Sequence, residues 1–481
     1  MSEILSIIIF GLATIGIVLF IGLVLHRGYK VDKCLIPYIF YPIFFGLILE
    51  TLLSARNFYL SQELVGINLA HVTEKNPIDI WFGRAQSLFI IFASCEPIIW
   101  RLLHLRGEIS APIPLILAFG GFFLTNVLCS AFLGTHTSFS HDYIYMYLAG
   151  NAALLISCKE GDTAIRSCRN SLFTLIIIGA VCIIWRPEMV LLHDYKGLIP
   201  GLSIRYSGLS IHPNAYAPVV VLFLLTLWSK PFNVYWANLI SWLIGSLSLL
   251  LTQSKTNLIA FALCVLFICY YRYGDIIKRR IFDFRQFHLS VFFLLMFMML
   301  TFVVGVYFMF GGVSESIESF FLTEAGGDLM SFTGRDVIWG IAIQEWHSNP
   351  LFGYGLTIWD DDYRRKIGMP WATSAHSQFY QSLSSAGIIG VAGLFVYGLF
   401  LFWYALKTAR LSQGLTMSLF VLIITQSISE IPLSMISIGS GVVPHLLLLM
   451  VIAANLNTMK IVKSEKEANL LPPSFLYKGF K

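Results

Sequence analysis

The chain has 481 residues, of which 57% are hydrophobic and only 12% are charged, whereas roughly 25% of residues are charged in an ordinary soluble domain. This composition excludes a soluble fold, because about 274 apolar residues (57% of 481) would fill about thirteen membrane spans of ~20 residues each. The formal net charge of +5 is a modest excess, typical of basic cytoplasmic loops rather than of nucleic-acid binding.

Long apolar runs follow one another from the N-terminus, and their continuity predicts helices rather than the alternating strands of a membrane barrel. The first run precedes the first basic residues, so we expect a retained span rather than a cleaved signal. Ten helices are expected at residues 4–26, 34–54, 85–103, 111–134, 143–158, 172–190, 215–228, 234–251, 257–273 and 290–311. Three more are expected at residues 379–406, 415–430 and 441–454. The predicted fold class is all-α: a polytopic transmembrane protein with about 13 spans.

Lysine and arginine are concentrated in alternate connections between these runs, which predicts that those connections are cytoplasmic. The N-terminus is then outside and the C-terminus inside. Four regions follow: N-terminal transmembrane helices (1–311), a long external loop (312–378), C-terminal transmembrane helices (379–458) and a cytoplasmic tail (459–481). The basic connections contain Arg27, Lys30, Lys33, Arg101, Arg106, Lys159, Arg166, Arg169, Lys230, Arg272, Lys278, Arg279, Arg280, Arg285, Lys407, Arg410, Lys460, Lys463 and Lys466.

The external loop contains a stretch with helical spacing of apolar residues at 331–350. Thr333 suits the N-cap and the pair Asn349-Pro350 suits the end of a helix, which is expected to be amphipathic and to lie on the membrane surface. Arg335 would then occupy the first turn, where a cation opposes the helix dipole. This mild cost favours an anion ligand over a purely solvated arginine, although both interpretations remain open.

Further along the loop, Gly353 and Gly355 form a glycine pair that is either a plain turn or a turn packed against a ligand. The run Asp360-Asp361-Asp362 invites a divalent-metal interpretation. Consecutive carboxylates usually point in different directions and are solvated, however. The eight cysteines lack metal-type spacing, so we expect neither a metal site nor a disulfide framework.

Where the chain re-enters the membrane, His376, Tyr380 and Leu383 would share one face of a helix. An interfacial histidine is most often a polar group that reaches toward water. One beside a long arginine-bearing loop is also a candidate general base.

Two earlier outer connections add cations on the same side. Arg205 and His212 lie in one loop, and Lys255 lies in a tight turn between two apolar runs, where it is either an interfacial anchor or a partner for an anionic head group. Glu96 and Glu430 lie in apolar runs and need partners there, as ion pairs or functional groups. Together these residues predict an external, membrane-level pocket with several cations and one histidine, which suits a lipid-linked phosphate or diphosphate.

Three motifs carry a resemblance to a known family. They are Gly334-Arg335-x-x-Ile338-Trp339, Asn349-Pro350-Leu351-Phe352-Gly353-x-Gly355 and His376-x-x-x-x-Gln381-x-Leu383-x-x-x-Gly387-x-x-Gly390. In order and spacing they resemble the core of the bacterial O-antigen ligase and polymerase family. Arg205-x-x-Gly208 with His212-Pro-Asn214, and Gln253-Ser254-Lys255-Thr256, are similar to two earlier outer motifs of that family. The family usually has Ser-Arg at the last of these, so Ser254-Lys255 keeps the charge but loses the bidentate fork.

The resemblance implies a metal-independent glycosyltransferase without cofactors, acting on undecaprenyl-diphosphate-linked oligosaccharides at the outer face of the bacterial inner membrane. By this resemblance Arg205, Lys255 and Arg335 would bind the donor diphosphate, and His376 would deprotonate the acceptor hydroxyl. Expected partners are membrane lipids, a glycan or lipid A core acceptor, a flippase and a chain-length regulator, with no nucleic acid. The supporting residues would be Trp339, Gly353, Gly355 and His212.

A surface polysaccharide polymerase is the first expectation, for O-antigen, capsule or exopolysaccharide. One reason is that Ser254-Lys255 stands where the family usually has Ser-Arg. The other is a set of aromatic residues on the outer side that could stack on sugars, namely Trp339, Trp346, Trp359 and Trp371. The first alternative is an O-antigen ligase that transfers the glycan to lipid A core. The second is a bicarbonate or other solute transporter, which would need intramembrane charges along a path.

Overall fold

The computed structural model describes residues 16, 18–28, 33–54, 56–59, 76–103, 111–193, 202–281, 291, 298–299, 335–369 and 372–470. Most of the runs expected at residues 4–26 and 290–311, the first part of the external loop and the end of the tail lie outside these residues. The elements, with 3₁₀ or π segments labelled η, are η1 (Ile36–Tyr38), α2 (Phe40–Leu53), α4 (Pro77–Leu102), α5 (Ile113–Phe123), η2 (Leu124–Leu128), α6 (Cys129–Leu133), α7 (Tyr143–Ala153), α8 (Cys158–Trp185), α9 (Pro187–Val190), β1 (Leu191–Leu192), β2 (Arg205–Tyr206), α10 (Pro213–Ser229), α11 (Tyr235–Leu251), α12 (Lys255–Ile281), α16 (Arg335–Ser348), α17 (Asp361–Lys366), α18 (Gln378–Thr408), α19 (Leu415–Ser429), η5 (Ser440–Val442) and α20 (Val443–Leu470).

The predicted helical membrane fold is confirmed, although the count of about 13 spans is not. Among the described residues, seven helical segments are long and apolar enough to cross a bilayer, and four apolar helices are shorter. The seven are Ile36–Leu53, Pro77–Leu102, Ile113–Leu133, Cys158–Trp185, Lys255–Asp275, Gln378–Thr408 and Ser440–Val462. The helix expected at residues 143–158 is α7, whose 11 residues span about half of a ~30 Å hydrocarbon core at ~1.5 Å per residue.

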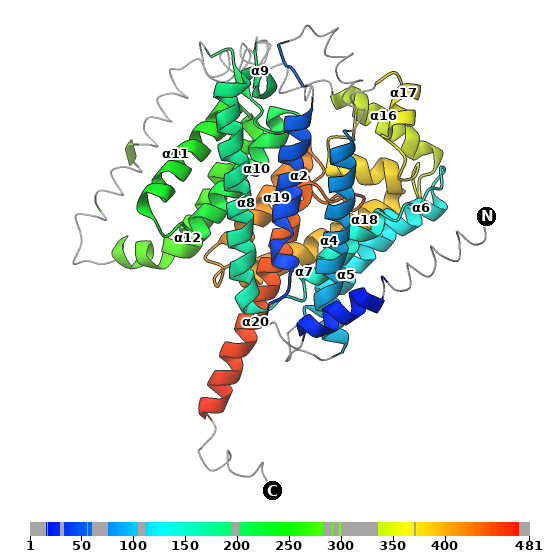
Figure 1. Ribbon diagram of the computed structural model, residues 1–481. Helices are drawn as coiled ribbons and strands as arrows, with labels where there is room; N and C mark the ends of the chain where they lie inside the picture. The colour runs from blue at the N-terminus through cyan, green and yellow to red at the C-terminus, as the bar shows by residue number, and fades with distance from the viewer. Residues whose placement is uncertain are drawn as a thin grey trace.

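The helix α8 packs against α10, α20 and α2, α4 lies on the far side of α2, and α11 and α12 are on the opposite flank (Figure 1). The sequence allows α8 and α20 to approach closely, because Gly161 faces Ala454 with no room for a side chain between them. Small residues at helix contacts are typical of membrane bundles, in which van der Waals packing replaces the hydrophobic effect. The contact between α8 and α20 is therefore closely packed.

Glu96 has a structural partner within this bundle. Its fully buried carboxylate pairs with Arg27, with Nε and Oε1 2.7 Å apart, and also accepts the amide of Leu35 at 2.6 Å. A buried charge that is both paired and hydrogen-bonded is satisfied where it lies. Glu96 thus joins the start of the chain to α4 as an ion pair.

The long helix α18 is broken at Gly387, and a distant loop fills the break. Gly387 has φ +65°, a left-handed conformation that favours glycine. The carbonyls released on one side of the break, those of Ser384 and Ser385, accept the amides of Tyr354 and Gly355 at 2.8 and 3.1 Å. On the other side, the amides of residues 388 and 389 donate to the carbonyls of residues 350 and 351. The loop thereby satisfies a helix break inside the membrane, where unpaired backbone groups are costly.

Replacing Gly387 by alanine should destabilise the protein by about 1–3 kcal/mol or more. A methyl group there would meet the backbone of Leu351 and Phe352, and φ would remain positive. The melting temperature of the purified protein in detergent measures the effect. Gly398→Ala is the matched control, because a side chain at that position of the same helix meets nothing within 4 Å. Equal melting temperatures for the two variants would contradict this description of the break.

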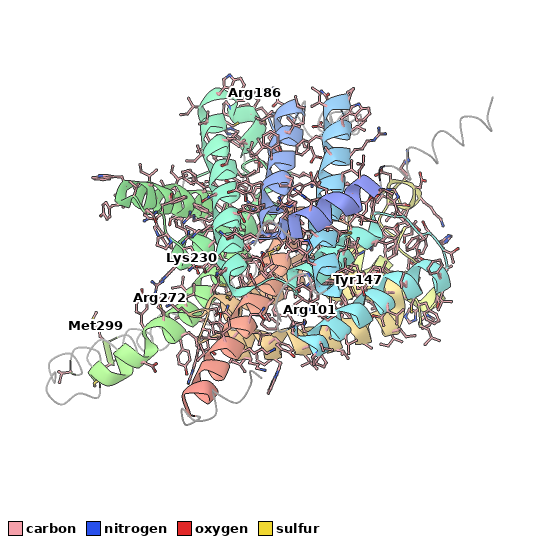
Figure 2. The ribbon with its side chains drawn as sticks, turned by 60° about the horizontal axis from the view of Figure 1, so that its bottom comes forward. Arg101, Tyr147, Arg186, Lys230, Arg272 and Met299 are labelled. Atoms are coloured by element: carbon pink, nitrogen blue, oxygen red, sulfur yellow. The ribbon has the colours of Figure 1, made fainter. Side chains whose placement is uncertain are left out.

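Three of the basic residues expected on the inner side lie toward one end of the bundle. Figure 2 shows Arg101, Lys230 and Arg272 toward the end that comes forward, and Arg186, from an outer connection, at the opposite end. Arg101 lies in the last turn of α4, Lys230 is the C-cap of α10, and Arg186 is the C-cap of α8. These three residues are thus separated from Arg186 along the length of the bundle.

Candidate functional site

Arg205 is anchored by a short strand pair at the end of the bundle where Arg186 lies. The strands β1 and β2 are antiparallel, with Leu192 opposite Arg205. The Arg205 side chain is buried, and it donates from Nε to the carbonyl of Thr252 at 2.8 Å and from Nη2 to Oδ1 of Asn214 at 2.7 Å. Arg205 thus connects its own loop to the start of α10 and to the turn between α11 and α12.

A residue that sequence reasoning missed holds this loop in place. Arg56 donates from Nη1 to the carbonyl of Ser210 at 2.5 Å and from Nη2 to that of Gly208 at 3.0 Å, and the Thr51 hydroxyl donates to the carbonyl of Leu209 at 2.9 Å. Burial lowers the pKa of Arg56 to about 10, so it remains a cation at neutral pH. Three successive carbonyls are therefore fixed, and with them the segment between Arg205 and the first turn of α10.

His212 is the N-cap of α10, and its Nδ1 accepts the amide of Asn214 at 3.2 Å. The proton of the neutral ring is therefore on Nε2. The ring is accessible to solvent but surrounded by protein atoms, and this desolvation, with a contribution from Arg205, lowers the pKa of His212 to about 4. Arg335, His376 and Glu430 are also within electrostatic reach of His212. Four outer segments therefore converge around this ring.

His212 should remain neutral above about pH 5, because its pKa is lowered rather than raised. Replacing it by glutamine should therefore leave the shape of the activity profile between pH 5.5 and pH 9 unchanged, even if the overall rate falls. The rate of glycan transfer against pH, measured for both proteins, tests this expectation. A limb of the profile that disappears in His212→Gln would contradict it.

The predicted tight turn before Lys255 is present and links α11 directly to α12. Thr252, Gln253 and Ser254 are buried, Gln253 has φ +51°, and its side-chain amide donates to the carbonyl of Ile204 at 2.8 Å. Lys255 is the first residue of α12. A lysine at a helix N-terminus combines its own charge with the positive end of the helix dipole, which suits an anion at this position.

The predicted helix at residues 331–350 is confirmed as α16, and Arg335 lies at its start. The helix packs on a second, smaller cluster within the outer region, through Ile338 and Ala342. Burial lowers the pKa of Arg335, whereas the Glu430 carboxylate acts in the opposite direction. The Nη2 atom of Arg335 lies 3.5 Å from Oε1 of Glu430, so this arginine faces the same region as His212.

The expectation that His376 lies on the re-entry helix is wrong. The helix α18 begins at Gln378, and His376 precedes it with φ +46°, a conformation uncommon for residues other than glycine. The preceding residue, Ala375, is held at both ends: its amide donates to Oε1 of Gln381 at 3.0 Å, and its carbonyl accepts Nε1 of Trp339 at 3.0 Å. Helical periodicity could not have predicted this strained position, because tertiary contacts impose it.

The carboxylate of Glu430 lies between the two groups just described. Oε2 is 3.5 Å from Nδ1 of His376, and Oε1 is 3.5 Å from Nη2 of Arg335. Glu430 is the C-cap of α19, and Leu433, three residues later, donates its amide to Oε1 of Gln378 at 3.0 Å. The sequence showed Glu430 only as a costly charge in an apolar run. The structure places it at a helix end, where it joins α16 to the start of α18.

The glycine pair and two of the tryptophans noted in the sequence pack within the protein. Gly353 (φ +73°) and Gly355 (φ +118°) form the loop that fills the break in α18. Trp339 stacks on Tyr380, with ring centroids 4.8 Å apart, and Trp359 is only 4% exposed. Trp359 is therefore not available as a flat platform for sugars, and one face of the half-buried Trp339 ring is occupied.

The aspartate run is likewise used within the protein. The Asp360 side chain caps α17 by accepting the amide of Tyr363 at 2.8 Å. Asp361 pairs with Arg364, and Asp362 pairs with Arg365 at 2.8 Å. Each carboxylate therefore has its own partner, in the solvated helical arrangement that the sequence favoured over a metal site.

Comparison with known protein families finds a match for part of this region. Residues 239–395 match the family model described as O-antigen ligase, which confirms the resemblance inferred from the motifs. The match begins within α11 and ends within α18, so it includes Lys255, Arg335 and His376, whereas Arg205 and Glu430 lie outside it. No curated protein matches the chain.

Proposed function

We propose that this protein transfers a polyprenyl-diphosphate-linked glycan to an acceptor hydroxyl at the outer face of the bacterial inner membrane. The match of residues 239–395 to the family model described as O-antigen ligase supports this proposal. The observation that carries this proposal is the position of Glu430, whose two carboxylate oxygens each lie 3.5 Å from a candidate site residue, His376 and Arg335. An imidazole beside a carboxylate, with cations nearby, fits base-assisted displacement of an anionic leaving group.

In the proposed step, the acceptor oxygen forms a bond to the anomeric carbon of the donor sugar, and the bond between that carbon and the diphosphate oxygen breaks. His376 takes the acceptor proton on Nε2, while Nδ1 faces the Glu430 carboxylate. This carboxylate stabilises the ring as it becomes charged. The negative charge leaves with the diphosphate.

The cations of the site have different proposed roles. Arg335 and Lys255 bind the departing diphosphate, Arg335 through its planar fork and Lys255 as a point charge at the start of α12. Arg205 donates to Thr252 and Asn214, so it contributes its charge while it holds the two loops together. This arrangement supports a transfer in which positive charge of the protein neutralises the leaving group.

Within this class, polymerisation of repeat units is the first candidate and ligation to lipid A core is the second. The Ser254-Lys255 departure from the family pattern still favours a polymerase. The burial of Trp359 removes one of the aromatic residues that could stack on sugars, which had also favoured a polymerase. The description of the matching family favours the ligase.

Deletion of the gene tests the proposed function. A polymerase is supported if the strain caps its lipid A core with single repeat units and makes no long chains. A ligase is supported if long chains accumulate on the polyprenyl carrier and the core remains unmodified. Unchanged surface glycan with impaired uptake of bicarbonate or another solute would contradict glycan transfer and favour the transporter.

Lys255→Arg should be tolerated or should lengthen the polysaccharide, because arginine keeps the charge and adds a bidentate fork. Lys255→Gln should lower transfer by about 10–100-fold, since a hydrogen bond to a charged group contributes roughly 1.5–3 kcal/mol. Polysaccharide ladders on a gel, compared at matched protein level, measure both effects. Loss of the ladder in Lys255→Arg would show that the turn excludes the guanidinium.

A further inference from the structure

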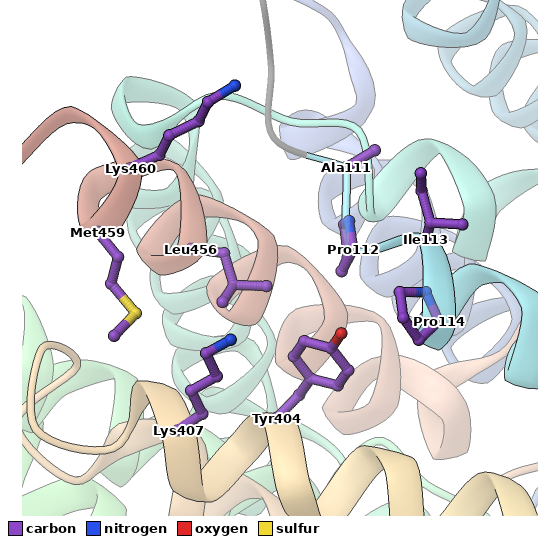
Figure 3. A pocket seen from close by; sticks show the side chains of 9 residues that line it. All are labelled: Ala111, Pro112, Ile113, Pro114, Tyr404, Lys407, Leu456, Met459 and Lys460. Atoms are coloured by element: carbon purple, nitrogen blue, oxygen red, sulfur yellow. The ribbon is translucent and has the colours of Figure 1, made fainter. Parts of the chain in front are cut away.

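A pocket lies at the end of the bundle opposite the candidate site. Its cavity of about 470 Å³ is lined by three helices and the segment that enters α5. Figure 3 shows Tyr404 and Lys407 from α18, Leu456, Met459 and Lys460 from α20, and Ile113 and Pro114 at the start of α5. His376 precedes the first residue of α18, whereas Tyr404 and Lys407 lie in its last two turns. The pocket and the candidate site are thus separated by the length of α18.

The pocket lies where three candidate membrane spans begin or end. One candidate span begins at Ile113, and two others end at Thr408 and Val462. All three connections at this end carry basic residues, so they belong to the set that the sequence assigns to the inner side. A ligand in the pocket would therefore be at head-group depth.

The chemistry of the lining is amphipathic. Leu456, Met459 and Ile113 form apolar walls, whereas Lys407 and Lys460 bring two ammonium groups from different helices. In Figure 3 the Lys407 ammonium points into the pocket, whereas Lys460 stands at its rim with its ammonium directed away from Lys407. The Lys407 Nζ also lies 5.7 Å from the centre of the Tyr404 ring.

The lysines, rather than the helix N-terminus, supply the positive charge of the pocket. Proline has no backbone N–H, and Pro112 and Pro114 occupy the N-cap and the second position of α5. Two donors that would make a helix start an anion site are therefore missing. The Tyr404 hydroxyl adds a neutral donor, which Figure 3 shows turned toward Pro112.

We propose that this pocket binds the head group of an anionic phospholipid of the inner leaflet, with its phosphate between Lys407 and Lys460 and the first part of its acyl chains along Leu456 and Met459. A lysine at a membrane interface commonly reaches toward water by itself. Here two lysines from separate helices line one pocket with apolar walls, which matches the charge and the amphipathic character of such a lipid. The site is independent of the proposed function, and it would hold α5, α18 and α20 together at their inner ends.

Native mass spectrometry of the full-length, detergent-purified protein tests this proposal with phosphatidylglycerol and phosphatidylcholine of identical chains. The wild type should retain phosphatidylglycerol at a concentration about tenfold or more below that needed for phosphatidylcholine, because each lysine near an anionic surface favours binding. The double variant Lys407→Gln/Lys460→Gln should lose this preference. Arg410→Gln, an exposed cation just beyond α18 that does not line the pocket, should keep it.

If Lys407→Gln/Lys460→Gln does not accumulate, the thermal stability of the protein in lipid nanodiscs tests the same proposal. Phosphatidylglycerol should raise the melting temperature of the wild type in nanodiscs more than phosphatidylcholine does, and Lys407→Arg/Lys460→Arg should keep this difference. Equal binding of both lipids by the wild type, or an unchanged preference in the glutamine variant, would overturn the proposal. Displacement of the lipid by millimolar inorganic phosphate would assign the site to free phosphate and would also overturn it.

Discussion

Replacing His376 by alanine should abolish glycan transfer while the protein still inserts and accumulates. In the proposed mechanism the imidazole is the only general base, and the loss of such a base typically lowers a rate by a factor of ~10²–10⁴. The structure places Nδ1 of this ring 3.5 Å from Glu430, which leaves Nε2 for the acceptor. Polysaccharide ladders from cells with matched protein levels measure the effect.

His347→Ala is the matched control for this variant. His347 is an exposed histidine in the last turn of α16 that packs on Trp346, and its loss should leave the ladder intact. A full-length ladder from His376→Ala would remove the assignment of the base. Loss of the ladder in both variants would indicate a general sensitivity of the outer region instead.

Replacing Glu430 by glutamine should have the second largest effect, a loss of about 10²-fold or more. A carboxylate that orients a catalytic imidazole contributes through the tautomer and through the charge of the protonated ring, and Glu430 also pairs with Arg335. Glu430→Asp should recover part of the activity because it restores the charge. Initial rates of transfer at varied acceptor concentration should show a fall in kcat larger than any change in KM.

A double variant of Glu430 and His376 shows whether Glu430 positions the His376 ring or only supports the structure. If Glu430 acts through His376, then Glu430→Gln should cost little further activity in a protein that already carries His376→Ala, since residues that act as a unit are not additive. Additive losses in the double variant would contradict this role. They would leave Glu430 as an ion-pair partner of Arg335 only.

Much of the fold could be predicted from the sequence because a membrane imposes strong local rules. Continuous apolar runs must be helices, and the helix at Arg335–Ser348 followed from its stop signal and spacing. The number of spans was harder to predict. An apolar run does not reveal whether its helix will be 28 residues long, as α8 is, or 11 residues long, as α7 is, because packing against other helices decides this length.

The candidate site was predicted as a set of residue types but not as a geometry. Arg205, Lys255, Arg335 and His376 were proposed from charge and resemblance. The contacts that arrange them come from residues far away in sequence, such as Thr252 on Arg205 and Glu430 on His376. Arg56 had no signal in the sequence beyond its charge, since its role depends on the carbonyls of Gly208 and Ser210. Backbone acceptors of this kind are invisible in a sequence.

The most direct test of the central claim is a transfer assay with the purified protein in proteoliposomes. The donor would be a synthetic oligosaccharide repeat unit on polyprenyl diphosphate, and the buffer would contain a chelator of divalent metals. We expect glycan chains longer than one repeat unit, the release of one polyprenyl diphosphate for each bond formed, and no products from His376→Ala. The absence of transfer by the wild type when both donor and acceptor are present, or equal product from His376→Ala, would contradict a glycan transferase built around His376, Arg335 and Glu430.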